Sequence, residues 1–243
     1  MNKIIIIFFF ITLPLYSQNY QSNNRSVLQA GSFSINIENN LVKAFNETGE
    51  NVFREKFVHP SGMISDLDSD GIDEYIIIDS SSFKGEPSYK IYIYNTVDSF
   101  YLVDSIDSGR TSPYFQIDDQ TDEVTLVTGN PVFDRYNMNT EFFFSPLNCW
   151  KYESSQVFLV NEEMYELLLT ENENIIEFIE DYSRDSYNCT FTKEILGAVT
   201  SAYVNYVNAG ETAIASQFLR KYYLCSDFDQ LKIELQKMLG KSD

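Results

Sequence analysis

The chain is poor in the residues that most often carry catalysis. It has one histidine, His59, among 243 residues, so zinc sites of the usual histidine-rich kinds are excluded. A Ser-His-Asp or Cys-His arrangement would have to use this histidine, and no nucleophile-elbow glycine pattern accompanies it. The ten glycines include no phosphate-cradling loop. We therefore expect a protein that is not an enzyme, although the many acids leave open a carboxylate pair for glycoside hydrolysis.

Long apolar runs are also scarce. The one long run covers residues 4–13, about half of the roughly 20 residues that a membrane-spanning helix needs, and it follows Lys3. This pattern predicts a signal peptide at residues 1–17, cleaved near Ser17 or Gln18, and a mature chain secreted to the periplasm or outside the cell. No other segment is long and apolar enough for membrane insertion.

Basic residues are few, so the mature chain is strongly acidic. Loss of Lys3 with the signal peptide leaves 16 basic residues against 36 acidic ones, a formal charge of −20. Such a charge repels phosphate backbones and anionic lipid headgroups, which argues against nucleic acid and membrane surfaces as partners. It favours divalent cations and a basic protein as partners, unless it serves only to keep a secreted protein soluble.

Cysteine is limited to three positions, Cys149, Cys189 and Cys225. An exported chain meets an oxidising environment in which a disulfide can form, and the odd number leaves one thiol over. Two predicted helical segments lie between Cys189 and Cys225, and an antiparallel hairpin of these helices would bring the two cysteines together. We therefore predict a Cys189–Cys225 disulfide. Cys149, beside Trp150 in a predicted strand, is expected to be a small buried apolar residue.

The first two thirds of the mature chain predict strands. Short runs rich in β-branched and aromatic residues recur, among them 33–38 (FSINIE), 74–80 (EYIIIDS), 89–95 (YKIYIYN) and 140–145 (TEFFFS). Turn-forming segments separate the runs, and no helical spacer lies between them. We therefore predict an antiparallel all-β domain over residues 18–160.

The remaining residues, 161–243, predict a helical region, which makes the fold class α+β. In its second half, apolar residues follow helical spacing, and Gly210 is placed to end one of the helices. The first part of the region is ambiguous between helix and strand, and we expect helix from about Glu171.

A short acidic segment at residues 66–74, DLDSDGIDE, precedes an apolar run. A calcium loop needs oxygens that converge from alternate residues, a glycine where the chain turns sharply, and a main-chain carbonyl just after it. The segment supplies each of these in order, with Gly71 at the turn. The expected calcium ligands are Asp66, Asp68, Asp70, Ile72 through its carbonyl oxygen, and Glu74.

The loop departs from an EF-hand and resembles another calcium loop. An EF-hand requires a glutamate at its twelfth position, where this chain has Ile77, and a helix, where this chain has a strand-like run. The segment 64–78 resembles the D-x-D-x-D-G-x-x-[DE] loop of FG-GAP and VCBS repeats, found in integrin-type propellers and many secreted bacterial proteins. This resemblance implies a bound calcium ion. A propeller repeats the loop in each blade, whereas this chain has one copy, so we expect a compact β domain with a single calcium loop.

Two other interpretations of the acidic segment remain. Acids with a glycine also form surface turns that need no metal, and another hard cation such as magnesium could bind. Calcium is favoured over a metal-free turn because three carboxylates at a spacing of two repel one another, and a divalent cation relieves that repulsion. It is favoured over magnesium because magnesium demands tight octahedral geometry.

The wider layout has a weaker resemblance to secreted bacterial inhibitor or immunity proteins of the lysozyme-inhibitor type. It shares with them an early strand hairpin, one acidic loop and a meander that ends in the aromatic segment 149–160, CWKYESSQVFLV. We expect a secreted, non-enzymatic calcium-binding module that has a structural calcium ion and acts in protein interaction. The alternative, which this resemblance implies, is a periplasmic inhibitor of a basic, lysozyme-like cell-wall hydrolase.

Overall fold

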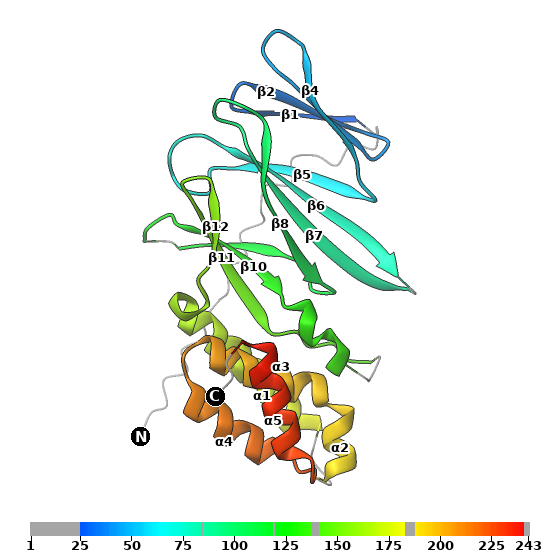
Figure 1. Ribbon diagram of the computed structural model, residues 1–243, viewed down its shortest axis with the longest axis vertical. Coiled ribbons are helices and arrows are strands. Elements are labelled where there is room, and N and C mark those ends of the chain that lie inside the picture. The colour runs from blue at the N-terminus through cyan, green and yellow to red at the C-terminus, as the bar shows by residue number, and fades with distance from the viewer. Residues whose placement is uncertain (1–24, 84, 119, 138–140, 183–187, 241–243) are drawn as a thin grey trace, which may run out of the picture.

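The computed structural model describes residues 25–83, 85–118, 120–137, 141–182 and 188–240. Within these ranges, twelve strands form three antiparallel sheets, and the main helices follow them in the chain (Figure 1). The expected α+β class is therefore confirmed. The predicted signal peptide, residues 1–17, lies outside the described residues. No helix in the described part of the chain is long and apolar enough to cross a membrane.

Each sheet is an antiparallel meander of four strands that are consecutive in the chain. The first sheet contains β1 (Arg25–Ala30), β2 (Phe33–Glu38), β3 (Leu41–Phe45) and β4 (Asn51–Lys56). The second contains β5 (Pro60–Ser65), β6 (Glu74–Phe83), β7 (Glu86–Asn95) and β8 (Tyr101–Gly109). The third contains β9 (Tyr114–Ile117), β10 (Val124–Gly129), β11 (Leu147–Glu153) and β12 (Gln156–Leu159).

The second sheet lies between the other two, and its strand β6 is buried on both faces (Figure 1). Tyr75 and Ile77 pack with Ile35 of the first sheet, whereas Ile76 packs with Leu126 of the third. Because side chains alternate between the two faces of a strand, a strand that is buried on both sides has a continuous apolar run. This arrangement explains why the chain is apolar without interruption at residues 75–78.

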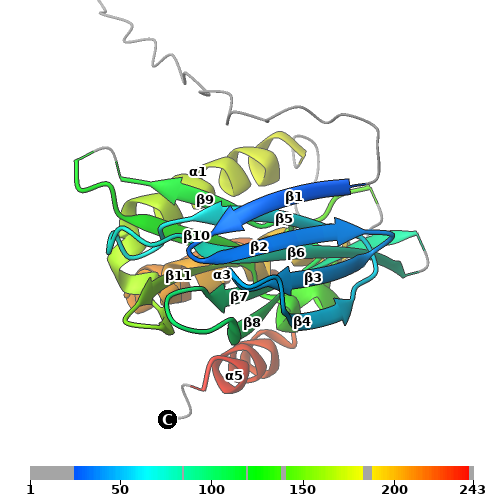
Figure 2. The ribbon, with the colours of Figure 1, turned by 90° about the horizontal axis from the view of Figure 1, so that it is seen from above.

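Helices cover the end of the molecule beyond the third sheet (Figure 1), and in the view from above α1 and α5 extend past the edges of the strands (Figure 2). Two short 3-10 helices, η1 (Pro131–Tyr136) and η2 (Asn161–Met164), lead into this region. The α-helices are α1 (Tyr165–Tyr182), α2 (Cys189–Glu194), α3 (Leu196–Asn208), α4 (Thr212–Tyr222) and α5 (Phe228–Met238). α3 contacts both α1 and α4, and most of its side chains are buried, so it forms the centre of the helical core.

The helical region packs directly on the third sheet. Leu147, the first residue of β11, donates its N–H to Asn205 Oδ1 at 2.9 Å, and its carbonyl oxygen accepts from Asn208 Nδ2 at 3.1 Å. Leu147 and Cys149 also pack with Leu168 of α1. These buried hydrogen bonds and apolar contacts join the last layer of strands to the helices.

Two local predictions of secondary structure are wrong. Residues 141–145, the described part of the run TEFFFS, form no strand. Two of their rings pack on α1 instead, where the centroids of Phe142 and Phe144 lie 5.0 and 4.7 Å from that of Phe178. α1 begins at Tyr165, earlier than the expected Glu171, because its first turn is needed to pack on the third sheet.

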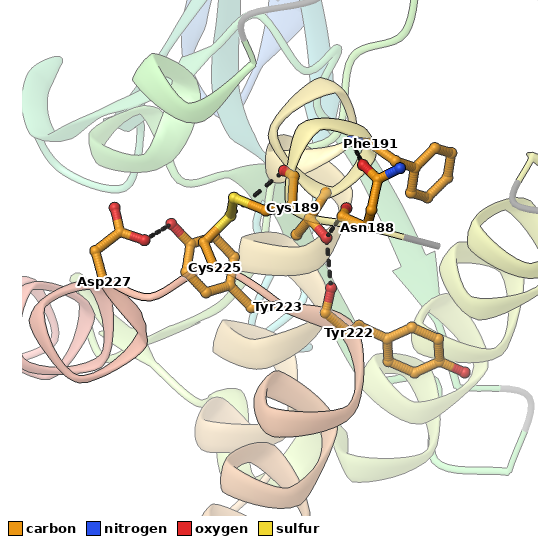
Figure 3. The surroundings of a disulfide bond; sticks show 8 residues. Asn188, Cys189, Phe191, Tyr222, Tyr223, Cys225 and Asp227 are labelled. Atoms are coloured by element: carbon orange, nitrogen blue, oxygen red, sulfur yellow. Dashed lines mark hydrogen bonds between the residues drawn. A yellow bond between two sulfur atoms is a disulfide. The ribbon is translucent and has the colours of Figure 1, made fainter. Parts of the chain in front are cut away.

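The structure pairs Cys189 with Cys225, the pair expected from the helical segments between them (Figure 3). The bond joins the first residue of α2 to the segment that follows α4, and the two Cα atoms lie 4.7 Å apart. Thr192 Oγ1 donates to the carbonyl oxygen of Tyr222 at 3.3 Å and holds the same two segments together. Cys149 is free and buried in β11.

Replacement of both disulfide cysteines by serine is expected to lower the free energy of unfolding by about 2–4 kcal/mol, because the bond closes a long loop in the unfolded chain. Thiol alkylation of the denatured protein provides the direct check. One cysteine, Cys149, should react without reductant and all three with it. Three reactive thiols in the absence of reductant would contradict the disulfide.

Candidate metal centre

The acidic segment forms the hairpin loop between β5 and β6, whose end residues Ser65 and Glu74 are paired. The carboxylate of Asp66 organises this loop from within. Its Oδ1 accepts the N–H of Asp70 at 3.1 Å, and its Oδ2 accepts the N–H of Gly71 at 2.9 Å. Gly71 has a φ of 87°, a conformation that glycine adopts without steric cost, so the chain can turn sharply there.

Three of the predicted ligands converge on one point. Carboxylate oxygens of Asp66, Asp68 and Glu74 all lie within 4.8 Å of one another. Asp66 and Asp68 are half-buried, and Glu74 is completely buried with 0% exposure. The exposed acids of an ordinary surface turn lie in water, which screens their repulsion, whereas these carboxylates are largely shielded from it.

The oxygens of Glu74 and Asp68 are incompletely satisfied. Glu74 Oε2 accepts the N–H of Leu67 at 3.0 Å, but Oε1 is buried and has no hydrogen-bond partner among the described residues. Asp68 Oδ2 accepts the N–H of Ser154 at 3.2 Å, while its Oδ1 is also buried without a partner in this part of the chain. Buried acceptors normally have partners, so these two oxygens are available to a ligand such as a cation or a proton.

The electrostatics of the cluster agree with this interpretation. Burial raises the pKa of Glu74 to about 7. The hydrogen bonds from Leu67 and Tyr152 oppose the shift, and the charges of Asp68 and Asp70 add to it. Burial also raises the pKa of Asp68, and the charge of Asp70 contributes to that shift. Without a cation, Glu74 therefore keeps a proton for part of the time near neutral pH. A divalent cation would displace that proton and supply the missing partner for the orphaned oxygens.

Asp70 is the predicted carboxylate ligand that lies in the loop but not in the cluster. Asp70 is exposed, and its Oδ1 accepts the N–H of Ile72 at 2.8 Å. Asp73 is not one of the predicted ligands. Its carbonyl oxygen accepts a hydrogen bond from Thr96 Oγ1. This bond pins the end of the loop to the turn after β7. The contact from Ser154 was not predicted, because no sequence pattern links residues that lie 86 positions apart.

A second acidic turn satisfies its carboxylate in a different way. Asp118 is exposed, and its Oδ1 accepts the N–H groups of Gln120 at 2.8 Å and Thr121 at 3.0 Å. These hydrogen bonds lower the pKa of Asp118, so its charged form is already stabilised. The two turns have similar acidic composition, and burial is what distinguishes the segment 66–74.

Comparison of the chain with protein-family models, with curated proteins and with solved structures finds no match. The case for a cation therefore depends on the chemistry of the loop. Carboxylate oxygens are the ligands of hard cations, and calcium and magnesium are the common ones.

Glu74→Gln is expected to change stability in opposite directions with and without calcium. In chelator at pH 8 it should raise the free energy of unfolding by about 1–3 kcal/mol, because a neutral amide replaces a buried, poorly compensated carboxylate. In calcium it should lower that free energy relative to wild type, because a charged ligand is lost. Urea unfolding under both conditions measures the two effects.

The matched control is Asp122→Asn, which removes an exposed acid from the other acidic turn. Asp122 has a φ of 59°, a conformation that asparagine also accepts. The control should shift the unfolding free energy by less than about 0.5 kcal/mol in either condition. If Glu74→Gln lowers the free energy of unfolding in chelator as well as in calcium, the interpretation that the Glu74 carboxylate is uncompensated without a cation is wrong.

Proposed function

We propose that the protein is a secreted, non-enzymatic calcium-binding protein in which Asp66, Asp68 and Glu74 hold a structural calcium ion. The observation that carries the proposal is the completely buried carboxylate of Glu74, whose Oε1 lacks a partner beside two further carboxylates. Burial of a carboxylate that is satisfied at only one oxygen is costly, and a counter-charge would offset that cost. One divalent ion would compensate all three carboxylates at once.

The spacing of the cluster is compatible with calcium. Calcium binds oxygens at about 2.3–2.6 Å, so two ligands on opposite sides of one ion lie about 5 Å apart. The three carboxylate oxygens are within 4.8 Å of one another and can therefore share a single ion. Calcium takes six to eight ligands, and the positions left over would be filled by Asp70, the carbonyl of Ile72 and water. Asp70 Oδ1 already accepts a backbone N–H, which leaves its Oδ2 for the ion.

Export to an oxidising compartment is supported by the disulfide. Disulfides persist outside the cytosol and are rare inside it, and Cys189 and Cys225 are paired. The apolar run at residues 4–13 is the expected export signal and lies outside the described residues. Extracellular calcium is abundant, so a secreted protein can use it as a permanent part of its structure.

Calcium is expected to raise the melting temperature of the wild-type protein by about 5–10 °C when free calcium is 100 times its Kd. Binding to the folded state alone contributes about 2.7 kcal/mol under that condition, and 1 kcal/mol corresponds to about 2–4 °C at this chain length. Asp68→Asn should lose the response, whereas Asp122→Asn should keep it. Scanning calorimetry in calcium, magnesium and chelator tests this.

The calcium proposal fails if wild-type protein melts at one temperature in calcium and in chelator while calorimetric titration detects no binding. A larger rise of the melting temperature in magnesium than in calcium would identify magnesium as the preferred ion. Loss of the response in Asp122→Asn would show that acidity in general, and not the loop, produces the effect.

The second candidate is a periplasmic inhibitor of a basic, lysozyme-like cell-wall hydrolase, and the acidic face of α1 favours it. Three glutamates at helical spacing, Glu166, Glu173 and Glu177, are exposed on this helix, and no basic residue occupies its last turn. Such a face would attract a cationic protein through long-range electrostatics.

This candidate predicts binding to a cationic cell-wall hydrolase that weakens steeply as salt is raised. Replacement of the three α1 glutamates by glutamine should reduce the association rate constant at least tenfold, because exposed charges at the edge of an interface act mainly on the rate at which the two proteins meet. A matched triple variant removes exposed acids elsewhere, at Glu38, Glu47 and Asp98, with the same change in net charge. Surface plasmon resonance at low and high salt measures both variants, and equal effects would argue against a specific acidic face.

A further inference from the structure

The acidic loop of the second sheet touches the third sheet. Asp68 Oδ2 accepts the N–H of Ser154 at 3.2 Å, and Ser154 lies in the tight turn between β11 and β12. Ser154 and Ser155 have φ values of 52° and 61°, as a two-residue hairpin turn requires, so the direction of this N–H is set by the turn itself. One of the converging carboxylates is therefore anchored on a strand pair of another sheet.

A second polar link runs parallel to the first. Asn95, the buried last residue of β7, donates from Nδ2 to Tyr152 Oη at 3.3 Å and to Ser155 Oγ at 3.0 Å. Tyr152, on β11, lies beside the carboxyl group of Glu74. The hairpin β11–β12 thus contacts both the acidic loop and the last residue of β7.

Apolar contacts also connect the acidic loop with the second and third sheets. Leu67, which stands between the two ligands Asp66 and Asp68, is buried with Ile91 and Ile93 of the second sheet. The same cluster contains Leu126 and Tyr152 of the third sheet, and Trp150 packs against it. Because Leu67 is covalently fixed between two ligands, movement of the ligands would move a residue of the core that joins the sheets.

We propose that the cation locks the β11–β12 hairpin of the third sheet onto the second sheet, so that docking of this hairpin depends on metal occupancy. The inference rests on the calcium site proposed above. Without the ion, repulsion among Asp66, Asp68 and Glu74 spreads the loop, and this withdraws the acceptor of the Ser154 N–H and the side chain of Leu67. With the ion, the three carboxylates are drawn together and both contacts are held.

Hydrogen–deuterium exchange of the full chain in calcium and in chelator tests the coupling, with calcium binding measured separately by calorimetric titration. At free calcium of 100 times the Kd, amides whose opening releases the ion should exchange about 100-fold more slowly. We expect this protection in peptides that cover residues 147–159 as well as in the loop. Peptides from the first sheet, residues 33–45, should change by less than about threefold.

The single tryptophan provides a second readout. Trp150 lies on β11, donates its Nε1–H to Thr128 Oγ1 at 2.9 Å and packs against the core between the sheets. Its emission should shift during a calcium titration with the same midpoint as the calorimetric binding curve. The shift should be absent in Asp68→Asn and retained in Asp122→Asn.

The outcomes separate this inference from the calcium proposal. If calorimetry shows calcium binding but protection stays within residues 64–74 and Trp150 emission is constant, the coupling is wrong and the calcium site stands. If no binding is detected, both are overturned. Protection that spreads equally over the first sheet would indicate general stabilisation and would also overturn a specific link to the hairpin.

Discussion

The β region depends on how the chain compensates the buried carboxylate of Glu74. This residue opens β6, the strand whose two faces form the cores on both sides of the second sheet. Its side chain lies at the edge of these cores with no exposure to water, and one of its oxygens has no partner among the described residues. The packing of the central strand is thus coupled to the electrostatics of the acidic loop, because Glu74 is both the first residue of β6 and a member of the carboxylate cluster.

Burial, and not the number of acids, separates the acidic loop from the rest of the acidic surface. The turn at Asp118 satisfies its carboxylate with backbone N–H groups in contact with water. Glu166, Glu173 and Glu177 of α1 are exposed, and solvent and salt screen their charges. Only a carboxylate that is removed from water needs a specific counter-charge, so the formal charge of −19 is by itself weak evidence for a metal.

The predictable parts of the structure are those that depend on residues close in sequence. The alternate acids and Gly71 define the loop within nine residues, and the uninterrupted apolar run after Glu74 marks a strand. The disulfide could be predicted because the helical periodicity between Cys189 and Cys225 indicates an antiparallel helical hairpin, which brings the two cysteines together. Three of the five predicted ligands converge, whereas Asp70 uses one oxygen to cap the backbone of its own loop.

The parts that could not be predicted depend on contacts between distant segments. The N–H of Ser154 reaches Asp68 because two sheets stack, and a serine in a hairpin turn carries no signal of that partner. The aromatic run at residues 141–145 has the composition of a strand, but α1 offers its rings a better packing surface. In both cases tertiary packing determines the outcome and local preference does not.

The layers form a continuous chain of contacts from the acidic loop to the helices. Asp68 and Leu67 connect the loop to β11 and β12, and the first residue of β11, Leu147, is hydrogen-bonded to Asn205 and Asn208 of α3. β11 therefore carries the loop contact at one end and the helix contact at the other. Stabilisation of the loop by a cation would act on β11, which contacts both the second sheet and the helical core.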